Sequence, residues 1–232
     1  MSSTDSARYL VAAIRPWNRR IFRERIATLP GRWRLIDDPR WLSPARLTAI
    51  QPRYVFFLHW SWKVPAWLLE RCECVGFHMT DLPYGRGGSP LQHLILRGRR
   101  QTTLTALRLT GSLDAGPVYL KRPLSLAGSA EQIYARASRL AARMIRTIVA
   151  RRPAPVPQRG RAVVFGRRRP EQSRIAGQQG LERLHDFIRM LDAEGYPRAF
   201  LEAGGFRFEF SRAARRDGRL QARVAITPVS EP

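Results

Sequence analysis

The 232-residue sequence predicts an α/β fold, in which a mainly parallel β-sheet carries helices on both faces and precedes a small, mostly β C-terminal subdomain. Strand-like and helix-like runs alternate over the first two thirds of the chain. Residues 54–58 are all apolar, as expected for a parallel strand that is covered on both faces. The end of the chain instead holds three strand-like runs separated by glycine-containing turns, which favours a small antiparallel sheet.

The first half of the chain supplies most of the predicted sheet. Short apolar runs predict strands over residues 9–14, 33–36, 54–58 and 73–77. A basic segment that ends near Leu29 suits a helix between the first two strands. Ser43 and Ser89 each precede a proline, so we expect them to cap helices over residues 44–50 and 90–96.

The next elements extend the same pattern. Strands are predicted over residues 103–109 and 118–121. A capping box from Ser129 to Gln132 then opens the clearest helix, whose apolar residues recur at helical spacing through Ala150. Repeated strand–helix units of this kind predict a Rossmann-like layer structure.

A change in composition predicts the domain boundaries. Residues 151–180 are rich in proline, arginine, glycine and glutamine and contain one strand-like run, residues 162–165. An amphipathic helix over 184–191 and strands over 199–202, 206–210 and 220–226 follow. We therefore predict a main domain over 1–152, a linker over 153–180 and a C-terminal subdomain over 181–232.

The formal net charge of +23 is extreme, and only two of the 41 basic residues are lysines, Lys63 and Lys121. The arginines are spread along the chain without a basic stripe or a nucleic-acid-binding motif, so nucleic acid is not the expected partner. A GC-rich genome or a phosphate-bearing small substrate explains the charge instead. Cys72 and Cys74 suit two ordinary buried thiols, and no metal-ligand spacing is present. No run of 18 apolar residues and no export pattern occur, so we expect a cytoplasmic protein with no membrane partner.

The segment from Gly76 to Pro90, GFHMTDLPYGRGGSP, carries the strongest chemical signal. His78 comes at the end of a predicted strand, where a parallel sheet opens its ligand crevice. A glycine-rich loop then leads into the start of a helix, which suits an anion. Asp114 lies in a second loop between strands, and a carboxylate beside an imidazole orients it for proton transfer. A structural histidine and a simple turn-forming aspartate are the alternatives.

These residues resemble the formyltransferases that use 10-formyltetrahydrofolate, including methionyl-tRNA formyltransferase and the sugar-nucleotide formyltransferases. The family signature is Asn-x-His-x-Ser-Leu-Leu-Pro, then Tyr-Arg-Gly, a small residue and Pro, and later Asp-x-Gly. The matching residues are His78, Thr80 (for Ser), Leu82, Pro83, Arg86, Gly87, Pro90, Asp114 and Gly116. Gln158, the segment 167–172 and the segment 188–200 fit the family pattern as well, so the resemblance covers roughly residues 53 to 212.

One position departs from the family. The resemblance implies that an asparagine two residues before the histidine stabilises the oxyanion, but Gly76 stands there. Three interpretations stay open: another donor, such as a backbone N–H freed by Gly76 or the hydroxyl of Thr80, replaces the amide; the enzyme is slow; or the protein binds without transferring. The intact His78 and Asp114 favour retained chemistry.

The resemblance also implies the remaining roles. It implies catalysis by His78 and Asp114, and an acceptor anion held by Arg86 and Gly87. Folate would bind beside six residues: Trp60, Trp62, Lys63, Val64, Ser112 and Leu113.

The chain is short for a tRNA enzyme, so a small amine, first a nucleotide-linked amino sugar and second another amine, is the expected acceptor. A homodimer is a further expectation. A folate-, anion- or RNA-binding protein is the rival interpretation.

Overall fold

The computed structural model describes residues 7–229. These residues form two compact units, each assembled from separate stretches of the chain. The first unit contains residues 7–87, then Thr103–Leu124 and Ala135–Val164. The second contains Gly88–Thr102, Ser125–Tyr134 and residues 165–229. The domain boundaries after residues 152 and 180 remain a prediction, since these compact units are interleaved in sequence.

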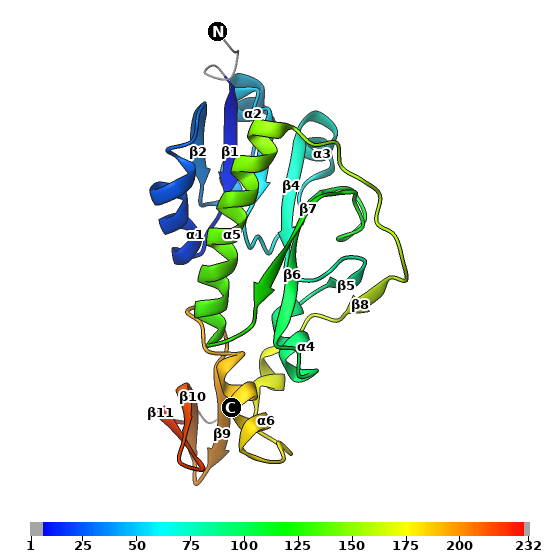
Figure 1. The fold of residues 1–232 in the computed structure, drawn as a ribbon. Helices are drawn as coiled ribbons and strands as arrows, with labels where there is room; N and C mark the ends of the chain where they lie inside the picture. The colour runs from blue at the N-terminus through cyan, green and yellow to red at the C-terminus, as the bar shows by residue number, and fades with distance from the viewer. Residues whose placement is uncertain (1–6, 230–232) are drawn as a thin grey trace. The chain divides into compact units, whose positions relative to one another are not determined.

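A six-stranded sheet in the order β2-β1-β3-β4-β6-β7 lies mainly in the first unit (Figure 1). Its strands are β1 (Arg8–Ala12), β2 (Arg32–Ile36), β3 (Tyr54–Phe57), β4 (Glu73–His78), β6 (Gln101–Arg108) and β7 (Val118–Ser125). The first four strands pair in parallel, which confirms the predicted mainly parallel arrangement. Strand β6 pairs antiparallel with β4, so the sheet is mixed.

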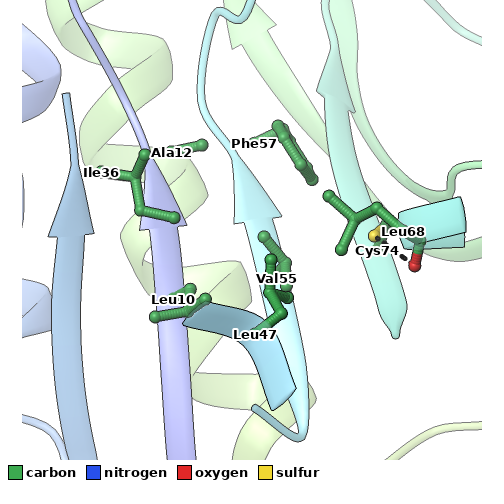
Figure 2. Packing of buried hydrophobic residues seen from close by; sticks show 8 residues of the cluster. All are labelled: Leu10, Ala12, Ile36, Leu47, Val55, Phe57, Leu68 and Cys74. Atoms are coloured by element: carbon green, nitrogen blue, oxygen red, sulfur yellow. Dashed lines mark hydrogen bonds between the residues drawn. The ribbon is translucent and has the colours of Figure 1, made fainter. Parts of the chain in front are cut away.

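Helices cover both faces of this sheet. They are α1 (Pro16–Ile21), which continues as a π-helix over Phe22–Ile26, α2 (Pro44–Ile50), α3 (Ala66–Arg71) and α5 (Ala130–Arg151). Helices α2 and α3 lie on one face, and α5 crosses the opposite face (Figures 1 and 2). The two-sided cover explains why residues 54–57 are apolar without alternation, as a strand buried on both faces requires.

The core beneath α2 and α3 is built from alternate strand residues (Figure 2). Leu10 and Ala12 of β1 lie beside Val55 and Phe57 of β3, because every second residue of a strand points to the same face. The set is completed by Ile36, Leu47, Leu68 and Cys74. Full burial of one large aliphatic side chain contributes about 1.5–3 kcal/mol, so this cluster holds α2 and α3 on the sheet.

Asn18, the chain's only asparagine, links α1 to α5 inside the first unit. Its side chain is 1% exposed, its amide nitrogen donates to the Leu58 carbonyl at 3.0 Å, and its amide oxygen accepts from the Ser138 hydroxyl. Both ends of the amide are therefore engaged, the nitrogen with the chain after β3 and the oxygen with α5.

The second unit joins two helices to a three-stranded antiparallel sheet. Its elements are α4 (Pro90–Leu96), α6 (Leu181–Arg189), β9 (Ala199–Ala203), β10 (Phe206–Arg216) and β11 (Arg219–Pro228). Gly204-Gly205 and Asp217-Gly218 form the turns between these strands, which confirms the predicted glycine-containing turns. Arg189 is 5% exposed, pairs with Asp186 at 2.6 Å and donates to the carbonyls of Leu126 and Gly128.

The predicted caps had mixed outcomes. The capping box of α5 is present, since the Ser129 N–H donates to Gln132 Oε1 at 3.0 Å and the Gln132 N–H donates to the Ser129 hydroxyl at 3.3 Å. The prediction that Ser43 and Ser89 cap helices through their side chains is wrong. Ser89 has a φ of 49° and its hydroxyl instead accepts from the Arg168 N–H. Both helices nevertheless begin at the expected proline, whose φ suits the first turn.

A short two-stranded sheet pairs β5 (Tyr84–Gly87) with β8 (Val163–Phe165). Strand β5 was not predicted, because its sequence is glycine-rich and shows no apolar alternation. Among the described helices, none has the length and apolar character needed to cross a membrane.

Candidate active site

His78 is the last residue of β4, and both of its ring nitrogens face oxygen atoms. Nε2 lies 2.7 Å from the Gly85 carbonyl oxygen, and Nδ1 lies 3.5 Å from Asp114 Oδ2. The His78 and Asp114 side chains are only 10% and 14% exposed. The structure thus brings together the two residues that the sequence predicts as the catalytic pair.

Asp114 is held by its own backbone and by the glycine-rich strand β5. It has a left-handed φ of 50°, which aspartate tolerates better than most residues, and its Oδ2 accepts the Gly87 N–H at 2.9 Å. Two residues later, a Cβ at Gly116 would lie 1.8 Å from the Arg108 carbonyl oxygen. The loop that carries Asp114 therefore packs so closely against the end of β6 that only glycine fits at 116.

The geometry of this pair suits proton transfer. A neutral imidazole carries one N–H and can donate to only one of the two facing oxygens, whereas the protonated ring can donate to both. The carboxylate of Asp114, 3.5 Å from Nδ1, stabilises the protonated form of the ring. An imidazole in this setting can accept a proton from one atom and return it to another.

The Gly85 carbonyl that faces His78 also binds Thr80. The Thr80 hydroxyl donates to this carbonyl at 3.3 Å, and the Thr80 carbonyl accepts from the Thr105 hydroxyl at 2.6 Å. Thr80 is fully buried, so it supports the loop after β4.

Arg86 forms its hydrogen bonds with a neutral side chain from a distant part of the sequence. Its Nε and one terminal nitrogen donate to Gln158 Oε1 at 3.1 and 2.8 Å. The Gln158 amide nitrogen donates to the Asp114 and Gly116 carbonyls, both at 2.8 Å. The sequence associated Gln158 with the family pattern but assigned it no role, because two of its partners are backbone carbonyls, which leave no side-chain signature.

Gly76 lies in β4, opposite Leu107 of β6 and Phe57 of β3. A Cβ built at this position would lie 2.6 Å from Leu109 Cδ2, so a leucine side chain occupies the space beside the glycine. The only asparagine in the sequence, Asn18, is committed to packing α1 and α5 and supplies no amide here.

The residues expected to bind folate occupy two segments. Phe57, which ends β3, pairs with Gly76, so the segment after it leaves the sheet at the same edge as the segment after His78. In this segment the Trp60 and Trp62 rings lie 5.0 Å apart, Val64 packs on the core cluster and Lys63 is exposed. In the second segment, Ser112 and Leu113 are exposed and precede Asp114. Folate contact by these six residues remains a prediction.

Lys121 is a supporting residue that the sequence did not single out. Its ammonium group donates to Asp81 Oδ1 at 2.6 Å and to the Leu82 carbonyl at 2.5 Å. These contacts tie β7 to the loop that follows His78. A search of residues 7–229 finds no cluster of three or more histidine, cysteine or acidic side chains placed to bind a metal ion.

His59 follows β3 and has a left-handed φ of 52°. Its ring lies 5.8 Å from the Trp17 ring. Burial of the imidazole, reinforced by the charge of Arg15, lowers the pKa of His59 to about 3. His59 is therefore neutral at physiological pH.

Comparison with known proteins identifies relatives of this chain. Residues 170–227 match the family model described as the C-terminal domain of methionyl-tRNA formyltransferase. A methionyl-tRNA formyltransferase from Sinorhizobium medicae is 31% identical over 140 residues, which cover 57% of this chain and 44% of the relative. The chain spans about half or less of the length of the curated relatives it matches.

Two solved structures extend the comparison. HypX from Aquifex aeolicus, solved in complex with tetrahydrofolic acid, has a TM-score of 0.73 at 16% identity, covering 89% of this chain and 37% of HypX, which shows a shared fold. The structure of methionyl-tRNA formyltransferase from Clostridium thermocellum has a TM-score of 0.91 at 42% identity, covering 96% of this chain and all of that one. With 42% identity over the full length of a solved relative, the chain belongs to the formyltransferase family.

Proposed function

We propose that this protein transfers a formyl group from 10-formyltetrahydrofolate to a primary amine, with His78 and Asp114 as the catalytic pair. The observation that carries the proposal is the His78–Asp114 contact, flanked by Gly85 and Gly87, in a chain that is 42% identical to a methionyl-tRNA formyltransferase.

In the proposed reaction, the amine nitrogen attacks the formyl carbon and a new C–N bond forms. The bond between that carbon and N10 of the folate then breaks, and tetrahydrofolate leaves. The attacking amine loses one proton and N10 gains one. His78 moves this proton, while Asp114 holds the ring in position and stabilises its protonated form.

The oxyanion of the tetrahedral intermediate needs a hydrogen-bond donor, because removing one such donor typically costs about 10²–10³ in rate. Gly76 has no side-chain donor, and Leu109 occupies the neighbouring space. We assign the donor role to backbone N–H groups, joined by His78 Nε2–H when the bound substrate draws it from the Gly85 carbonyl oxygen, which lies 2.7 Å away in this structure. The Thr80 hydroxyl donates to the same carbonyl and would have to leave it in the same way.

The first acceptor that we propose is the amino group of methionyl-tRNA. The 42% identical relative carries that name, and the C-terminal segment matches the corresponding domain model. The sequence alone disfavours a nucleic-acid partner, and the relatives reverse this preference. A nucleotide-linked amino sugar stays the second candidate, since the Arg86 guanidinium is bonded to the neutral Gln158 amide and keeps its charge for a phosphate.

The test is to incubate the protein with 10-formyltetrahydrofolate and either methionyl-tRNA or a panel of nucleotide-linked amino sugars, and to measure tetrahydrofolate release. We expect release with one acceptor class, and a loss of about 10²–10⁴ in rate in His78→Asn and Asp114→Asn. Full activity in both variants would refute the assigned roles. Salt-dependent binding of RNA without release in any arm would favour the rival binding protein.

A cytoplasmic location and a homodimer remain predictions.

A further inference from the structure

We infer that Gln158 is a positioning residue, which sets the place of Asp114 and thereby the His78–Asp114 contact. This inference rests on the proposed function, because it assigns Gln158 a part in the same reaction. Gln158 belongs to an extended segment between α5 and β8.

The segment that carries Gln158 is fixed to the sheet two residues earlier. Val156 and Val118 exchange both backbone hydrogen bonds, each at 2.8 Å, at the point where β7 begins. The chain then delivers the Gln158 side chain to the loop that ends at Pro117. The position of Gln158 is thus set by the backbone of β7 rather than by its own side-chain contacts.

The amide of Gln158 is fully used. Its two N–H groups donate to the carbonyls of Asp114 and Gly116, and its oxygen accepts both bonds from Arg86. A carbonyl can only accept and a guanidinium can only donate, so the chemistry of the partners fixes which end of the amide points which way. Glutamate has no donors for the two carbonyls, and asparagine is one methylene shorter.

These bonds act on a strained part of the chain. Asp114 has a left-handed backbone, and Gly116 has no room for a side chain. The Asp114 carboxylate is bound at one oxygen by the Gly87 N–H, while its carbonyl is bound by Gln158. Without Gln158, the backbone of this turn loses two donors, and the carboxylate loses its fixed distance from His78.

A double-mutant cycle tests the inference. Gln158→Met should lower kcat about tenfold with little change in KM for 10-formyltetrahydrofolate, since a displaced carboxylate weakens catalysis rather than folate binding. In an Asp114→Asn background, under single-turnover conditions, Gln158→Met should lower the rate of formyl transfer by less than about twofold, because the carboxylate that Gln158 positions is already absent. A tenfold loss in both backgrounds would overturn the inference.

A second variant separates the two ends of the amide. Gln158→Glu keeps acceptors for Arg86 but has no donors for the Asp114 and Gly116 carbonyls, so it should lose as much kcat as Gln158→Met. Wild-type kcat in Gln158→Glu would show that the Arg86 contact matters instead and would overturn the inference.

A matched control separates positioning from stability. The Gln92 amide nitrogen is buried and donates to the Tyr134 hydroxyl and the Met190 carbonyl at 3.2 and 3.0 Å. Gln92→Met should lower Tm without changing kcat.

One readout needs no turnover. Hydrogen exchange of the Gly87 amide, which Asp114 binds, should accelerate in Gln158→Met and stay unchanged in Gln92→Met. Unchanged exchange in Gln158→Met would refute positioning. Faster exchange in a protein that transfers no formyl group would leave the positioning intact and refute the proposed function.

Discussion

Replacing Gly116 with alanine should displace the catalytic loop by a predictable amount. The new Cβ would start 1.8 Å from the Arg108 carbonyl oxygen, and real Cβ contacts are essentially never shorter than 3.0 Å. The obstacle is backbone and not a flexible side chain, so the loop itself must move by more than an ångström. Asp114 lies two residues away, and its Oδ2 is already 3.5 Å from His78 Nδ1.

A misplacement of this size costs about 10² in rate when it reaches a catalytic group. We therefore expect Gly116→Ala to lower kcat about a hundredfold and to destabilise the fold by about 1–3 kcal/mol through overcrowding. Formyl transfer measured by tetrahydrofolate release, together with thermal unfolding, checks both numbers.

The same loop supplies the control. A Cβ at Gly111 would meet nothing within 4 Å, and this glycine does not have a positive φ. Gly111→Ala should therefore keep wild-type kcat and stability. If Gly116→Ala folds and retains kcat within about twofold of wild type, the rate does not depend on the loop position and the reasoning from Asp114 is refuted.

Three further predictions concern stability and use thermal or urea unfolding as the measurement. Gly76→Ala should lower the free energy of unfolding by about 1–3 kcal/mol, because its Cβ would lie 2.6 Å from Leu109 Cδ2. Adding Leu109→Ala should relieve that crowding, so additive losses in the double mutant would contradict this explanation. Arg189→Met should cost about 3 kcal/mol, since it leaves the Asp186 carboxylate without its closest cation; a loss below about 1 kcal/mol would contradict the burial argument. His59 should make stability depend on pH, because its pKa of about 3 in the folded chain lies below the value of about 6.5 expected in the unfolded chain. Between these two values only the unfolded chain binds the proton, so the free energy of unfolding should fall by up to ~1.4 kcal/mol per pH unit as the pH drops. A His59→Asn variant with the same slope would refute the assignment.

Much of the fold could be predicted because its signals are local. The apolar run at 54–58 and the capping box at Ser129 each report a structure that neighbouring residues decide. No local pattern predicts the direction of β6, because the alternation of side chains along a strand is the same for parallel and antiparallel pairing. The prediction that the Ser89 side chain caps a helix was wrong, because its hydroxyl instead accepts a hydrogen bond from the N–H of Arg168, 79 positions away.

The candidate site likewise contains features that the sequence predicts and features that only the structure reveals. His78 and Asp114 could be paired from the family resemblance, and the structure places them in contact. The bonds of Gln158 could not be predicted, because it sits in an extended segment without periodicity and binds backbone carbonyls. The consequence of Gly76 was likewise hidden, because only the structure shows Leu109 filling the adjacent space.

The interleaving of the two compact units limits how this chain can be recombined with its relatives. The second unit includes α4 and the first turn of α5, whose partners lie near the end of the chain: Gln92 binds the Met190 carbonyl, and Arg189 binds the Leu126 and Gly128 carbonyls. A chimera joined at a single crossover near residue 165 would separate these partners and leave the Arg189 guanidinium facing foreign backbone. Exchange of the C-terminal region therefore requires three coordinated replacements rather than one splice.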